Sequence, residues 1–71
     1  MAKLRPISGR QLTKILCNEF GFSVQRILGS HATLSKGNRY ITVPFKEIGI
    51  GLLGRILRDC GIGRNDFLQV L

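Results

Sequence analysis

A single histidine stands among polar and basic residues in the stretch GSHATLSKGNRYITVP, residues 29–44. His31 is the only histidine of the 71 residues. Imidazole is the side chain that ordinarily exchanges a proton near neutral pH, so His31 could take a proton from a hydroxyl or give one to a leaving oxygen. The alternative interpretation is an exposed strand histidine that has no catalytic task.

Basic side chains flank this histidine in the sequence and could hold a phosphate group while negative charge develops on it. Gly29 and Ser30 offer backbone N–H groups that an anion can approach closely. Cleavage of RNA is a reaction that needs both a proton-transfer group and such cations. The cations predicted to bind RNA are Arg26, Lys36, Arg39 and Lys46. For Lys36 and Arg39, a solvated turn whose charges discourage edge-to-edge strand pairing is an equally open interpretation.

The overall charge favours a polyanionic partner. Eleven Lys and Arg stand against four Asp and Glu, so the net charge is +7. An excess of this size on a small domain is typical of proteins that bind nucleic acid, or else an acidic protein surface. The hydrophobic fraction of 44% is sufficient for a packed core, and the length predicts one domain over residues 1–71.

Several classes of site are not expected. Cys17 and Cys60 are far apart, no CxxC motif occurs, and one histidine cannot complete a zinc site, so neither a metal nor another cofactor is predicted. The two cysteines are interpreted as buried thiols in a reducing compartment, which predicts a cytoplasmic protein. The apolar run IGIGLLG is far shorter than the roughly 20 residues of a membrane span, so no membrane association is expected.

Helical spacing of apolar residues predicts two main helices. Residues 9–20 form the first, with Ser8 and Gln11 as a capping box and Gly21 ending it. Residues 51–61 form the second. Its expected buried stripe is Leu52, Leu53, Ile56, Leu57 and Cys60, while Arg55 and Asp59 could form an i,i+4 pair on its exposed side. A short last helix is expected within residues 63–71, anchored by Phe67, Leu68 and Leu71.

Three strands lie between these helices, at residues 22–27, 32–35 and 40–43. Phe22 and Val24 are expected on one face of the first. In the hairpin that follows, alternation of side chains pairs Leu34 with Ile41 and leaves Gly37-Asn38 as a two-residue turn. The apolar face then holds Ala32, Leu34, Ile41 and Val43, and the polar face holds His31, Thr33, Tyr40 and Thr42. Tyr40 could stack on a base or serve only in packing.

The resulting order is α-β-β-β-α with a short C-terminal helix. This order predicts the α+β class, with a three-stranded antiparallel sheet whose helices cover one face.

From about Ser8 onward the chain resembles the HicA (YcfA-like) toxins. The resemblance is carried by the opening helix SGRQLTKIL and by GFSVQRILGSH, which is similar to the aromatic-strand-Arg-x-x-Gly-Ser-His run of that family. The family's G-r-x-x-x-V-P appears here as GNRYITVP, and GLLGRILRDCGI is similar to the closing helix. RNDFLQVL is similar to the last helical turn of the family.

This resemblance implies a double-stranded-RNA-binding-domain-like fold and the toxin half of a type II toxin–antitoxin system. It implies a metal-independent mRNA interferase, an endoribonuclease, in which His31 is catalytic, Gly29 and Ser30 stand beside it and Arg26 matches the motif arginine. It also implies mRNA as substrate and a HicB-like antitoxin as partner.

The chain departs from the family pattern at three positions. Ala32 stands where a second histidine is common, VPFKE lacks a further histidine after the Val-Pro pair, and Leu52 replaces the helix threonine. His31 is therefore the sole candidate for proton transfer. Two other functions stay open: a non-catalytic RNA-binding domain of the same fold, and a domain whose charge serves only an acidic protein partner.

Overall fold

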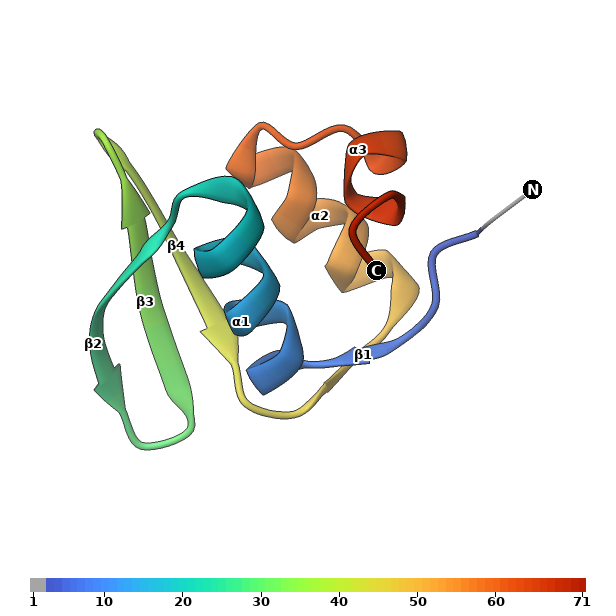
Figure 1. The fold of residues 1–71 in the computed structure, drawn as a ribbon. Helices are drawn as coiled ribbons and strands as arrows, with labels where there is room; N and C mark the ends of the chain where they lie inside the picture. The colour runs from blue at the N-terminus through green and yellow to red at the C-terminus, as the bar shows by residue number, and fades with distance from the viewer. Residues whose placement is uncertain (1–2) are drawn as a thin grey trace.

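The computed structural model describes residues 3–71, and it confirms the α+β class and the α-β-β-β-α order. There are two further strands of two residues each: β1 precedes the first helix, and β5 follows the sheet. In chain order the elements are β1 (Ile7–Ser8), α1 (Gly9–Phe20), β2 (Ser23–Leu28), β3 (His31–Lys36), β4 (Arg39–Pro44), β5 (Glu47–Ile48), α2 (Ile50–Cys60) and α3 (Arg64–Leu68) (Figure 1).

The first helix begins and ends where its capping residues predict. The Oγ of Ser8 accepts a hydrogen bond of 3.1 Å from the backbone N–H of Gln11, which satisfies one of the free donors of the first turn. Leu12 and Leu16 have no exposed surface, so the apolar stripe of α1 faces the core. Gly21 follows α1 in the left-handed conformation and turns the chain toward β2.

Both hairpins of the sheet use a two-residue turn that begins with glycine. The strand order is β2-β3-β4, all antiparallel. Gly29 and Gly37 have φ angles of 59° and 61°, and no residue other than glycine has a positive φ among residues 3–71. This combination is the one that a type II′ turn requires. The predicted register of β3 against β4 is confirmed at every pair from His31↔Pro44 to Lys36↔Arg39.

The helices cover one face of the sheet and leave the other open. In Figure 1, α1 and α2 lie on the same side of the three strands, with α3 beyond them. Both α1 and α2 contact β4. Ala32, Leu34 and Val43 point into the core that this contact forms and have no exposed surface. The opposite side, called the open face below, carries the polar set of the hairpin, His31, Thr33, Tyr40 and Thr42.

A β-bulge in β2 changes which side chains reach the open face. Val24 pairs with Leu34 but Arg26 pairs with Thr33, so Gln25 is the extra residue between them. Arg26 therefore shares the open face with Thr33, whereas simple alternation from Phe22 and Val24 would place it on the helix side. The Nε2 of Gln25 donates a hydrogen bond of 2.6 Å to the Oγ of Ser35, which lies on the same face.

Three expectations about the periphery are wrong or incomplete. The short ladder of β1 and β5, which pairs Ile7 with Ile48, was not predicted from the sequence. Leu52 and Leu71 were expected to be buried, but they are 37% and 58% exposed. Leu52 lies on α2 at a position that no neighbouring element covers fully, and Leu71 lies beyond the end of α3. Within residues 3–71, no helix is long and apolar enough to cross a membrane.

Gly9, the first residue of α1, packs closely against the backbone at the end of β4. Gly54, inside α2, has room around it for a side chain. A Cβ on Gly9 would lie 1.8 Å from the carbonyl oxygen of Pro44, but one on Gly54 would meet nothing within 4 Å. We predict that Gly9→Ala lowers the free energy of unfolding by about 1–3 kcal/mol, while Gly54→Ala raises it by up to about 1 kcal/mol. Urea titration of both variants tests this; equal effects would contradict the close approach.

Candidate active site

His31 is the first residue of β3, and its position on the open face is set by two backbone partners. Its Cα is paired with that of Leu28 on β2 and with that of Pro44 on β4. The side chain is exposed to solvent, as the strand register predicts. Thr33 and Thr42, one step along the open face, are a cross-strand pair. An imidazole in this setting can reach a large ligand without a movement of the backbone.

Three segments far apart in the sequence hold the backbone around His31. The N–H of Phe45 donates to the carbonyl of Ser30 over 2.6 Å, and the N–H of Gly9 donates to the carbonyl of Lys46 over 2.8 Å. The guanidinium carbon of Arg10 lies 4.7 Å from the centre of the Phe45 ring, a distance at which a cation is attracted to an aromatic face. The turn before β3, the segment after β4 and the start of α1 are thus joined.

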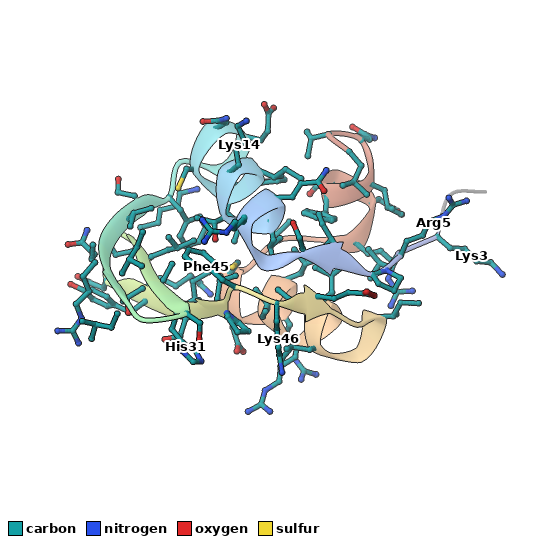
Figure 2. The ribbon with its side chains drawn as sticks, turned by 90° about the horizontal axis from the view of Figure 1, so that it is seen from below. Lys3, Arg5, Lys14, His31, Phe45 and Lys46 are labelled. Carbon is teal, nitrogen blue, oxygen red and sulfur yellow. The ribbon has the colours of Figure 1, made fainter. Side chains whose placement is uncertain are left out.

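Two of the predicted cations lie on the same side of the molecule as His31. Arg26 reaches the open face through the β2 bulge. Figure 2 shows His31 and Lys46 on one side of the ribbon and Lys14, on α1, on the other; Lys3 and Arg5 lie at the far end. Arg26 and Lys46 are exposed. A phosphate beside His31 would therefore meet positive charge from β2 and from the segment after β4.

Lys36 and Arg39 lie at the opposite end of the hairpin and on its helix side. They are five residues from His31 along β3, which is about 17 Å of strand, and they share a face with the buried Leu34. The Nζ of Lys36 lies 5.8 Å from the centre of the Phe22 ring. The Nη1 of Arg39 donates a hydrogen bond to the carbonyl of Asp59 near the end of α2. The structure does not bring this pair together with His31, and their binding of RNA stays a prediction.

Neither cysteine is suited to act as a nucleophile. Burial raises the pKa of the Cys60 thiol to about 11, even though the charge of Arg39 acts in the opposite direction. Burial also raises the pKa of the Cys17 thiol. Both groups are therefore thiols near neutral pH, and a thiolate is the reactive form. Among residues 3–71 no three His, Cys, Asp or Glu side chains are grouped so that they could hold a metal ion.

Sequence reasoning missed two features of this site. No role was predicted for Arg10 from the sequence, but its guanidinium lies over the Phe45 ring because the segment after β4 lies against the start of α1. Arg26 was a candidate, but its presence on the open face depends on the bulge at Gln25. The alternation of apolar and polar residues in β2 breaks where two polar residues, Gln25 and Arg26, follow one another. That interruption is the only signal in the sequence that could have indicated the bulge.

The hydrogen bond from Arg39 to the carbonyl of Asp59 is expected to stabilise the end of α2. A cation at a helix C-terminus stabilises the carbonyl groups that lack partners there. We predict that Arg39→Ala lowers the free energy of unfolding by about 1 kcal/mol. Arg58→Ala removes the same charge from the last turn of α2 but no hydrogen bond to Asp59, so it serves as the matched control for the contact and should cost less in urea titration. Equal losses in the two variants would show that the contact contributes nothing specific.

One comparison with known proteins finds a match. Residues 9–62 of the 71 match the model of a family described as "HicA toxin of bacterial toxin-antitoxin". The match begins at the first residue of α1 and ends just after α2, so it spans the three-stranded sheet and His31. No curated protein and no solved structure matches the chain.

Proposed function

Because the chain belongs to the HicA toxin family, it is the toxin of a toxin–antitoxin system, and we propose that it acts as a metal-independent mRNA interferase with His31 as its catalytic residue. The observation that carries this proposal is the exposed imidazole of His31 on a face that also holds Arg26. The family is generally associated with ribonuclease activity, which supports the same conclusion.

In the proposed reaction, His31 removes the proton from a 2′-OH of the RNA, and the resulting oxygen attacks the adjacent phosphorus. The bond to the 5′ oxygen breaks, that oxygen takes a proton from water, and a 2′,3′-cyclic phosphate remains on the upstream fragment. The protonated His31 then gives its proton to the hydroxide that is left, which restores the neutral imidazole and the water. A single histidine is sufficient for the first proton transfer, because the exposed site leaves water available for the second. No metal takes part in these steps.

Negative charge on the phosphate increases as the 2′ oxygen attacks, so cations beside it lower the barrier. Arg26 and Lys46 are the proposed partners of the phosphate that reacts. Gly29 adds no side-chain bulk at the turn before His31, which supports close approach of the RNA backbone, and Ser30 lies between them. Lys36 and Arg39 are proposed to contact RNA further along the strand, at the tip of the hairpin.

The proposed protein partner is a HicB-like antitoxin. The open face is not covered by any helix of this chain within residues 3–71, and a partner that shields it would block the reaction. The net charge of +7 favours an acidic surface on that partner.

A second candidate function is RNA binding without cleavage. It is favoured by Ala32 and by the lack of a histidine in VPFKE, because the chain offers one imidazole where the family commonly has more than one. The cations of the open face would still bind an RNA backbone in that case.

The catalytic proposal predicts a large effect of removing the imidazole. His31→Ala and His31→Gln should each slow cleavage of unmodified mRNA by about 10²- to 10⁴-fold, measured on denaturing gels with EDTA present. RNA affinity should change little, because the phosphate contacts remain. Cleavage at the wild-type rate by both variants would exclude His31 as the catalytic group. Tight RNA binding by a wild-type protein that cuts nothing would favour the second candidate.

The two ends of the hairpin can be compared by removing one lysine from each. Lys46→Ala takes a charge from the side of His31, and Lys36→Ala takes the same charge from a position over Phe22. We expect Lys46→Ala to reduce the cleavage rate more than Lys36→Ala, because only the first lysine is near the reacting phosphate. A greater loss with Lys36→Ala, measured in the same cleavage assay, would argue for a site at the hairpin tip.

A further inference from the structure

A groove between β4 and α2 opens beside the tyrosine of the open face. Its volume is about 360 Å³, and it is lined by Tyr40, Ile41, Thr42, Leu52, Arg55, Ile56 and Asp59. Ligand sites of proteins commonly begin at about 300 Å³, so the space is adequate for part of a nucleotide. Ile41 and Ile56 at its floor belong to the hydrophobic core, and the proposed reaction at His31 does not use this groove.

Tyr40 is unusually exposed for an aromatic residue. It stands on the open face opposite Ser35, with 67% of its surface in contact with solvent. Tyr40 is therefore not part of the packed core. An exposed ring on a strand is a surface on which an unstacked base can lie, and β-sheets that bind single-stranded RNA use aromatic residues in this way.

The direction of α2 places the residues of the groove in a definite order. Figure 1 shows β4 and α2 running in opposite directions, and Arg39, where β4 begins, is bonded to Asp59 near the end of α2. Arg55 is one helical turn before Asp59, so it lies about 6 Å nearer the end of the sheet that holds His31. Tyr40 is four strand residues from the level of His31, about 13 Å away.

The charges of the groove suit one orientation of a nucleotide. The guanidinium of Arg55 can hold a phosphate, as arginine does in many nucleic-acid sites. The carboxylate of Asp59 would repel a phosphate but can accept a hydrogen bond from an amino group of a base. A strand that leaves His31 would then pass Arg55 with its backbone and reach Tyr40 with a base.

We propose that the Tyr40–Arg55 groove is a nucleotide subsite for single-stranded RNA, in which a base stacks on Tyr40 and its phosphate contacts Arg55. This inference rests on the proposed function, since it takes RNA as the ligand and His31 as the point of cleavage. It deepens that proposal by naming the substrate class. In a duplex each base is stacked between its neighbours, so no base is free to reach Tyr40.

The probe for this subsite is a single-stranded RNA 2′-O-methylated at every position, which lacks the 2′-OH and cannot be cleaved by the proposed reaction. The same strand annealed to its complement is the duplex probe. By fluorescence anisotropy, Tyr40→Ala should weaken binding of the single strand by about 5- to 100-fold, and Tyr40→Phe by less than about twofold. Duplex affinity should stay within about twofold of wild type. Equal affinity of Tyr40→Ala and wild type for the single strand would overturn the proposal, as would an equal loss on both probes.

Arg55 has a matched control on the same helix. Arg58 is also exposed, but it does not line this groove; it lines a different hollow, together with Gly61 and Arg64. Arg55→Ala should reduce the slope of log affinity against log salt by about 0.7, the value for one phosphate contact on a single strand, and Arg58→Ala should leave the slope unchanged. An identical slope in the two variants would overturn the phosphate contact.

Cleavage of unmodified RNA separates this inference from the proposed function. If wild-type protein cleaves RNA but Tyr40→Ala binds the single-stranded probe as wild type does, the subsite is wrong and the nuclease proposal stands. If tyrosine-dependent binding of the single strand is found without any cleavage, the subsite stands and the nuclease proposal is wrong. Thermal unfolding of each variant confirms that it is folded, which is expected because both side chains are exposed.

Discussion

The antiparallel register of β3 and β4 is the constraint on which the rest of this domain depends. Leu34 and Val43 lose all contact with water because α1 and α2 lie over their side of the hairpin. Side chains alternate along a strand, so burial of these residues forces His31 and Thr42 onto the open face. A slip of one residue would expose the apolar set and carry the histidine into the core. The free energy that stabilises the fold therefore also holds the candidate catalytic group in water.

The cations on the two sides of the sheet differ in their contacts. Arg39 is bonded to the end of α2, and Lys36 lies over an aromatic ring, so both have structural contacts inside the domain. Arg26, Lys46 and Arg55 lie toward or beside the open face instead. A net charge of +7 indicates only that a polyanionic partner is favoured. The positions of individual charges decide which surface an RNA strand would follow.

The family resemblance and the chemistry of the open face lead to the same histidine by separate routes. Membership of the HicA toxin family follows from the match over residues 9–62. The suitability of His31 follows from its exposure and from its neighbours on β2 and β4. The groove beside Tyr40 adds a feature that neither route contains, because neither of them points to Tyr40 or Arg55.

The sequence by itself determined the hairpin, the ends of α1 and the face on which His31 lies. These features depend on local periodicity, capping and turn chemistry, and each involves residues close together in the chain. Only the tertiary structure decided that Arg26 reaches the open face, that Arg10 covers Phe45, and that Tyr40 and Arg55 share a groove. The bulge at Gln25 shifts the alternation of β2 by one residue. The contact of Arg10 with Phe45 and the groove of Tyr40 and Arg55 each join elements that are far apart in the chain. Periodicity within one element carries no information about which element will lie beside it, so these contacts could not be derived from spacing alone.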